Sequence, residues 1–170
     1  MLRQIGIEPE VVPVCIDESR WVGEAVASFA LRLAVAKAKA ALDPPSNGVV
    51  LGADTVVFLE NEIFAKPLTP GKAAVTLERL SGRCHQVATA VAVCRGGICQ
   101  QRIVFSRVCM KRLSVQEITD YIASGEPFDK AGAYAIQGRG AALIAQLEGS
   151  YTNVVGLPLQ ETVELLRINR

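Results

Sequence analysis

VVLGADTVVFL, residues 49–59, is an almost continuous run of apolar side chains that is rich in valine. Such a run is typical of a central strand that is buried on both faces of a sheet. Asp54 and Thr55 interrupt it, and an ionised carboxylate in a buried strand costs free energy unless it is paired, bound to a metal or placed at the strand's open end. Gly52 and Ala53 are small, so a ligand or another backbone could approach closely. Asp54 therefore belongs either to a functional site or to the cap of a nearby turn.

The segments before this strand predict three further elements. Residues 1–6 have the pattern of the last turn of a helix, which Gly6 ends. Residues 11–16 are a short apolar run that predicts a strand. Residues 24–42 carry apolar side chains with a period of 3.6 and predict a long helix, which Asp43-Pro44-Pro45 would end because proline restricts the residue before it and removes a donor.

The segments after it alternate between helical and strand patterns. In chain order they predict a helix over 69–80, strands over 87–95 and 98–111, a helix over 114–124, a strand over 142–147 and a helix over 158–168. Gly96-Gly97 is a strong hairpin signal, and Ser114 with Glu117 has the spacing of a capping box. No repeat or linker divides the chain. The sequence thus predicts a single α/β or α+β domain over residues 1–170, with a mixed rather than purely parallel sheet.

Composition narrows the class of protein. Half of the 170 residues are hydrophobic and the formal net charge is +1, so the chain is globular and lacks a strong field for nucleic acid polymers or anionic membranes. It shows neither a signal core nor the 18 apolar residues of a membrane span, which predicts a soluble, cytoplasmic protein. The cysteines are odd in number and lack CxxC spacing, which predicts inert thiols rather than zinc ligands or a disulfide framework. They are Cys15, Cys84, Cys94, Cys99 and Cys109.

Other charged residues are also candidates for a site. Lys37 follows Phe29 and Leu33 on the apolar stripe of the first long helix, so it either extends its amine to the surface or meets an anion in a pocket. Lys66 precedes a rigid proline and could hold a phosphate, although such lysines are usually just solvated. Asp17-Glu18 could hold Mg²⁺ or lie in a plain surface turn. Together these residues suit a metal-bound phosphate ester.

His85 is the only histidine, which excludes a site with two histidine ligands. A catalytic pair with the preceding Cys84 is geometrically poor, because adjacent residues of a strand face opposite sides. The polar, glycine-rich stretch 129–140 suits recognition of a small molecule and would equally suit a tight surface loop.

Five motifs in order along the chain resemble those of the Maf family. They are GADTVV (52–57), KP (66–67), LSGRCHQVAT (80–89), GEPFDKAGAYAIQG (125–138) and GSYTNVVGLPL (149–159). The resemblance implies a nucleoside triphosphate pyrophosphatase that releases a nucleoside monophosphate and pyrophosphate and needs a divalent cation, Mg²⁺ or Mn²⁺. The fold it implies is an elongated mixed sheet flanked by helices, with a cleft between two lobes, and such proteins are often homodimers.

The resemblance also implies roles for particular residues. Asp54 would be the proton acceptor that activates water and a metal ligand, and Glu18 would lie in the metal or phosphate site. Lys37 and Lys66 would reach the phosphates, which selects the pocket interpretation for Lys37. These roles agree with phosphoryl chemistry, which depends mostly on positioning and on neutralising developing charge.

Base selection is implied for two more residues, Thr55 and Gln137. The pair resembles the subfamily that acts on dTTP and UTP, whereas the subfamily acting on 7-methylated GTP tends to have GSDQ and SEG in place of GADT and IQG. The sequence therefore favours a pyrimidine nucleotide as substrate.

The chain departs from the family pattern at its start. The family opens with a strand, an SxSPRR loop and a leucine-rich helix, and residues 1–6 match only the end of that helix. We therefore expect the chain to lack the serine and the two arginines that grip phosphate. This leaves two alternatives to an active enzyme: a catalytically weak nucleotide-binding protein with a regulatory role in cell division, and a structural relic with neither activity nor binding.

Overall fold

The computed structural model describes residues 1–42 and 48–169, so the predicted helix end at 43–45 lies outside the described residues. None of the helices in these ranges is long and apolar enough to cross a membrane. The elements, in chain order, are η1 (Leu2–Ile5), α1 (Val26–Ala40), β1 (Val50–Leu59), β2 (Glu62–Phe64), α2 (Pro70–Leu80), β3 (Cys84–Arg95), β4 (Ile98–Met110), α3 (Val115–Ala123), η2 (Glu126–Asp129), η3 (Ala131–Ala133), η4 (Gly138–Leu143), β5 (Ile144–Glu148), α4 (Tyr151–Val155) and α5 (Leu159–Ile168).

The strands form one sheet in the order β2-β1-β3-β4-β5. The expected α/β class is confirmed, and every pairing between these described strands is antiparallel. Two-residue turns join β1 to β2 and β3 to β4, and the predicted hairpin at Gly96-Gly97 is confirmed, with φ angles of 56° and 82° that suit glycine. Because β2 pairs only with Val57–Leu59, β3 is the sole strand partner of residues 50–56 in the described chain.

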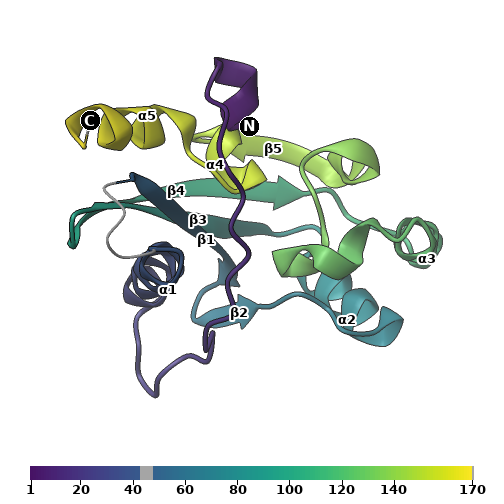
Figure 1. Cartoon of the computed structure of the whole chain (residues 1–170). Coiled ribbons are helices and arrows are strands. Elements are labelled where there is room, and N and C mark those ends of the chain that lie inside the picture. Colours follow the sequence, from purple (N-terminus) through teal and green to yellow (C-terminus); the bar gives the residue numbers. More distant parts are fainter. Residues whose placement is uncertain (43–47, 170) are drawn as a thin grey trace.

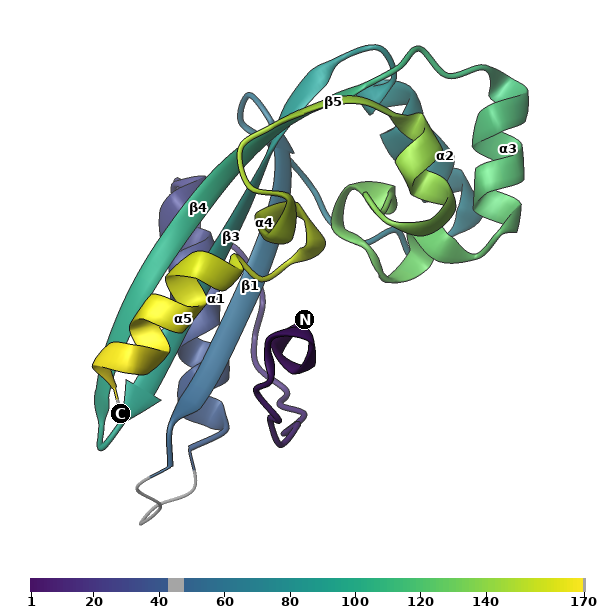
Figure 2. The same ribbon diagram turned by 90° about the horizontal axis from the view of Figure 1, so that it is seen from above.

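Helices cover both faces of this sheet (Figures 1 and 2). α1 packs on one face through fully buried Ala30, Ala34 and Ala38. α4 and α5 lie on the other face, where Leu165 meets Val91 and Val93 of β3. A separate apolar core gathers α2, α3 and the 3₁₀ turns at the far end of the strands. The molecule is therefore elongated along the strands, with α1 and α5 toward one end and α2 and α3 at the other (Figure 2).

Several predicted boundaries are confirmed by the side chains that make them. Gly6 ends η1 in a left-handed conformation, with φ 76°. The Thr69 side chain accepts from Lys72 N at the start of α2. The capping box of Ser114 and Glu117 is complete at α3. These signals are local, so the sequence alone can show them.

The strand predicted over residues 11–16 is wrong. This segment is extended but belongs to none of the described strands, and Val11 is 76% exposed. A β-rich composition becomes a strand only where a neighbouring strand and a packing surface exist. Some short elements were not expected, namely β2, α4 and the 3₁₀ turns η2, η3 and η4. The short helix α4 begins where the Ser150 side chain accepts from Asn153 N.

The prediction of free thiols is also wrong for four of the five cysteines. Disulfides join Cys84 to Cys109 and Cys94 to Cys99, and the exposed Cys15 is free. Both pairs stand directly opposite each other in the β3–β4 register. The two-residue turn at Gly96-Gly97 sets this register, so the predicted hairpin, once extended to Cys84, places both pairs opposite each other.

Candidate active site

A charged cluster lies where α1 crosses β1. The Lys37 ammonium contacts Asp54 Oδ1 at 2.6 Å and Glu18 Oε1 at 2.8 Å. Asp54 is in the middle of β1, Lys37 is in the last turn of α1, and Glu18 is in the extended segment that precedes α1. Three separate segments thus bring two carboxylates and one amine together, and Lys37 lines a pocket and contacts anionic groups there.

Gly52 allows this close crossing. A Cβ atom at residue 52 would lie 2.2 Å from Ala34 O and 2.6 Å from Ala38 N, so any side chain there would push α1 away. Because alternate residues of a strand face the same side, Asp54 faces α1 as well. Small residues on both elements therefore determine how closely Lys37 approaches Asp54.

Burial and the ion pair act on the pKa values of this cluster in opposite directions. Burial raises the pKa of Asp54, whose side chain is only 10% exposed, and the Lys37 ammonium lowers it without cancelling the rise. Burial lowers the pKa of Lys37, but its hydrogen bonds to Asp54 and Glu18 outweigh that effect and raise the pKa overall. The aspartate is thus a more basic carboxylate than an exposed one, beside an amine that stays protonated.

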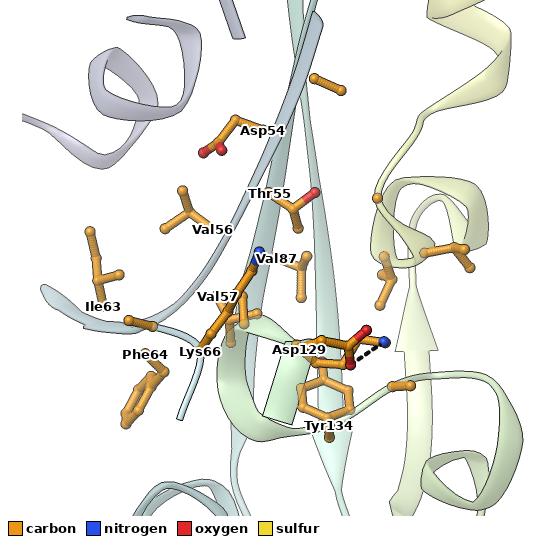
Figure 3. A pocket seen from close by; sticks show the side chains of 18 of the residues that line it. Asp54, Thr55, Val56, Val57, Ile63, Phe64, Lys66, Val87, Asp129 and Tyr134 are labelled. Atoms are coloured by element: carbon orange, nitrogen blue, oxygen red, sulfur yellow. Dashed lines mark hydrogen bonds and ion pairs between the residues drawn. The ribbon is translucent and has the colours of Figure 1, made fainter. Parts of the chain in front are cut away.

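Thr55 faces the opposite side of β1, toward α4 (Figure 3). Its hydroxyl lies 2.9 Å from the Thr89 hydroxyl of β3. Thr89 and Asn153 of α4 are both fully buried, and the Thr89 backbone N–H donates to Asn153 Oδ1 at 3.0 Å. Thr55 is therefore attached to a rigid polar network between the sheet and α4.

Gln137 and Lys66 lie on loops beside the strand. The Gln137 loop is held by Glu126, whose carboxylate accepts from Arg139 N at 2.9 Å and from Gly140 N at 3.1 Å, hydrogen bonds that lower its pKa. Lys66 follows β2, is exposed and lowers the pKa of the Asp54 carboxyl through its charge. An exposed amine near a buried carboxylate is free to turn toward a ligand.

One cavity of about 630 Å³ is lined by the charged cluster, Thr55, Lys66 and Gln137. Consecutive residues of β1, from Ala53 to Val57, line it although alternate side chains face opposite sides of the sheet. This is possible because, among the described strands, β1 has a partner on one side only up to Val56, and β2 joins its other side from Val57 onward. In Figure 3 the Asp54 carboxylate and the Thr55 side chain point to opposite sides of β1, and the Lys66 side chain extends toward the strand. The cavity thus contains all six predicted site residues, Glu18, Lys37, Asp54, Thr55, Lys66 and Gln137.

The donor set is compatible with a hard cation. Within residues 1–42 and 48–169, no three His, Cys, Asp or Glu side chains come together as a complete metal cage. Asp54 and Glu18 nevertheless converge on one ammonium group, so the same two carboxylates already share a cationic partner. Mg²⁺ often takes only one or two carboxylates, with phosphate and water oxygens as its other ligands. These residues therefore fit a cation that arrives with a phosphate substrate.

Sequence reasoning missed some residues of this site. Thr89 and Asn153 lie inside the motifs LSGRCHQVAT and GSYTNVVGLPL, but nothing in the letters shows that they meet Thr55. Asp129 and Lys130 also line the cavity and pair with each other, as the dashed line in Figure 3 marks. Their signal was the polar, glycine-rich stretch 129–140. His85 is buried and does not line the cavity, although it bonds at 2.7 Å to the hydroxyl of Tyr134, which does.

The fold and the site together define an α/β protein with an acidic, lysine-lined cavity beside a glycine-rich loop. A family model described as "Maf-like protein" matches residues 1–168, and the chain belongs to the Maf family. It is 47% identical over 167 residues to a protein of Salmonella typhimurium named dTTP/UTP pyrophosphatase, covering 98% of this chain and 85% of that protein. Proteins with the same name from Methylococcus capsulatus and Cereibacter sphaeroides are 46% and 49% identical over 168 and 167 residues, covering 98% of this chain and 83% and 86% of theirs.

Proposed function

We propose that this chain is a nucleoside triphosphate pyrophosphatase that hydrolyses dTTP and UTP to the monophosphate and pyrophosphate. The observation that carries the proposal is the buried Asp54 carboxylate, ion-paired to Lys37, in one cavity with Thr55 and Gln137. The names of the similar proteins support the same substrate class.

In this proposal Asp54 is the proton acceptor. A water molecule attacks the α-phosphorus, its proton passes to the Asp54 carboxylate, and the bond from the α-phosphorus to the bridging oxygen breaks, with pyrophosphate leaving. The raised pKa of Asp54 favours this role, because a general base works best when its pKa lies nearer the operating pH.

Lys37 and Lys66 have electrostatic roles in the proposal. Negative charge grows on the phosphate oxygens as the bond breaks, and preorganised ammonium groups stabilise that charge. Lys37 would turn from the carboxylates to the phosphates when substrate enters. A divalent cation, Mg²⁺ or Mn²⁺, would be held by Asp54 and Glu18, and when bound it supplies further neutralisation of phosphate charge.

The experiment that tests the proposal is pyrophosphate release from a panel of nucleoside triphosphates, with Mg²⁺ or Mn²⁺ and with a chelator. We expect turnover of dTTP and UTP above that of purine nucleotides, and loss of turnover with the chelator. Glu18→Gln should weaken activity, whereas Asp17→Asn, the matched change one residue away, should not, because Asp17 pairs with Ser19 N outside the cavity. Equal turnover of all nucleotides, or activity with the chelator, would refute the substrate or the metal part of the proposal.

The Lys37 ammonium occupies the proposed base, Asp54, and this ion pair also favours a second candidate, a catalytically weak nucleotide-binding protein. The regulatory role in cell division proposed for that candidate comes from the family resemblance. Nucleotide binding without turnover in the same panel would select this candidate. The proposal further includes a cytoplasmic location and a homodimer, which cell fractionation and size-exclusion chromatography would check.

A further inference from the structure

A fully buried polar network lies behind Thr55, and its donors and acceptors have only one consistent assignment. Asn153 Nδ2 donates to Val87 O at 3.0 Å and to Ser106 Oγ at 2.8 Å, while Asn153 Oδ1 accepts from Thr89 N at 3.0 Å. A backbone carbonyl can only accept and a backbone N–H can only donate. The orientation of the Asn153 amide is therefore fixed by its partners.

The same logic fixes the Thr89 hydroxyl. Thr89 Oγ1 lies 2.8 Å from Asn153 O, a carbonyl that can only accept, so the single hydroxyl proton of Thr89 is donated there. Thr89 Oγ1 also lies 2.9 Å from Thr55 Oγ1. Because the proton of Thr89 is already used, Thr55 must be the donor in this second hydrogen bond.

Thr55 therefore presents only lone pairs to the cavity. Its proton points into the sheet toward Thr89, and its oxygen can accept from a ligand but cannot donate to one. Thr55 and Gly156 both line the cavity, and a Cβ atom at Gly156 would lie 3.4 Å from Thr55 Oγ1, so the lack of a side chain there leaves the hydroxyl open to the cavity. Gly156 also has a φ of 112°, which L side chains rarely adopt, so this space stays open.

We infer that Thr89 and Asn153 are positioning residues that hold the Thr55 hydroxyl as an acceptor, so that the site selects a base with an N–H donor. Uracil and thymine carry such a donor at N3, whereas N3 of cytosine is an acceptor. Two acceptors that face each other leave both unpaired, and a site built around a hydrogen bond discriminates strongly against an analogue that lacks it. The choice of a pyrimidine nucleotide rests on the proposed function.

The first test uses the unmodified protein. UTP, CTP and N3-methyl-UTP differ at the atom in question, and we expect a KM about tenfold or more higher for CTP and N3-methyl-UTP than for UTP. The kcat should change less than KM, since the contact recognises the base and lies across the strand from Asp54. Equal KM values for the three nucleotides would overturn the inference while leaving the proposed hydrolysis intact.

The second test frees the Thr55 hydroxyl. In Thr89→Val the acceptor for the Thr55 proton is gone, so the hydroxyl can rotate and donate to cytosine, and the ratio of KM for CTP to KM for UTP should fall toward one. Thr89→Ser keeps the hydroxyl and should keep the ratio of the parent protein. If Thr89→Val does not fold, Thr55→Val supplies the same loss of preference. A ratio unchanged in the folded Thr89→Val or in Thr55→Val would overturn the inference.

Binding of the reaction products separates this inference from the proposed function. Calorimetric titration with UMP and CMP needs no hydrolysis, and we expect UMP to bind about tenfold more tightly. If UMP is preferred and no triphosphate is hydrolysed, the proposed function fails and the inference stands. If UTP is hydrolysed and UMP and CMP bind equally, the inference fails alone, and if neither binding nor hydrolysis occurs, both fail.

Discussion

Asp54 and Thr55 are neighbours on β1, yet they meet opposite kinds of surroundings. On the Asp54 side the partners are long charged side chains, and Lys37 and Glu18 remain 25% and 54% exposed. On the Thr55 side the partners are Thr89 and Asn153, which are fully buried and hydrogen-bonded in one arrangement. Charges on flexible stems can change partners when a phosphate enters, whereas a buried network keeps its direction. The Asp54 side of β1 therefore suits catalysis, and the Thr55 side suits recognition of a ligand.

The largest expected effect comes from removing the carboxylate of the charged side. Asp54→Asn should lower kcat by about 10²–10⁴-fold, the usual contribution of a general base. Nucleotide binding and the circular dichroism spectrum should be retained, because asparagine fills the same space. Asp17→Asn is the matched control. Most of the activity surviving in Asp54→Asn would show that another group accepts the proton.

Disrupting the buried network on the Thr55 side should lower the stability of the protein rather than its kcat. Asn153→Ala removes an amide that pairs with Val87, Thr89 and Ser106 and leaves their buried groups unsatisfied. We expect the free energy of unfolding in urea to fall by about 2–4 kcal/mol. Asn61→Ala, in the exposed turn between β1 and β2, should change it little. A stable Asn153→Ala protein would mean that the network is looser than its hydrogen bonds indicate.

A substitution at the contact between α1 and β1 should have a smaller effect on stability. Gly52→Ala places a methyl group against Ala34 O and Ala38 N, so α1 must move outward and carry Lys37 away from Asp54. We expect a loss of about 1–3 kcal/mol in the free energy of unfolding, together with lower activity. Gly71→Ala is a good control, because nothing lies within 4 Å of its Cβ position and alanine favours helix α2. Equal stability of both variants would contradict the close crossing.

The pH dependence of kcat/KM should report the ion pair. Burial raises the pKa of Asp54, so the carboxylate is protonated, and activity lost, at a higher pH than for an exposed aspartate. The Lys37 ammonium lowers that pKa, so Lys37→Met should move the acid limb of the profile to higher pH. Lys39→Met, two residues away and exposed, should leave the limb in place. If the acid limb stays at the same pH in Lys37→Met, the group that titrates there is not Asp54.

The smallest effect concerns His85, which does not itself line the cavity. Burial lowers its pKa from 6.5 to about 4, so the stability it contributes above pH 6.5 is lost as the pH falls toward 4. His85→Gln cannot take up this proton and should narrow the difference between urea midpoints measured at pH 7 and pH 4.5. An undiminished difference would assign the acid sensitivity to carboxylates instead.

Local signals explain what the sequence could predict. Helix ends at Thr69, Ser114 and Gly6 follow from capping chemistry, and the turn at Gly96-Gly97 follows from positive φ angles. Charge in an apolar or strand-end setting singled out Glu18, Lys37, Asp54 and Lys66, and the resemblance to a known family added roles for Thr55 and Gln137. The structure places all six on one cavity. Their chemical roles stay predictions.

Pairings between strands that no short turn joins could not be predicted. The cysteine pairs are different, because the two-residue turn at Gly96-Gly97 sets Cys94 opposite Cys99 and Cys84 opposite Cys109. Residues 11–16 remain unpaired because they meet no strand in the described chain, and Thr89 meets Thr55 because the two are register partners in β1 and β3. A single sequence shows propensity and spacing, but it does not show which strand lies opposite which.

The measurement that tests the central claim most directly is hydrolysis of UTP in ¹⁸O-labelled water, with products analysed by mass spectrometry. Attack of water on the α-phosphorus predicts UMP and pyrophosphate in equal amounts, with the label in UMP. UDP and phosphate as products, label in pyrophosphate, or no turnover at all would contradict the account of this cavity as a nucleotide pyrophosphatase site.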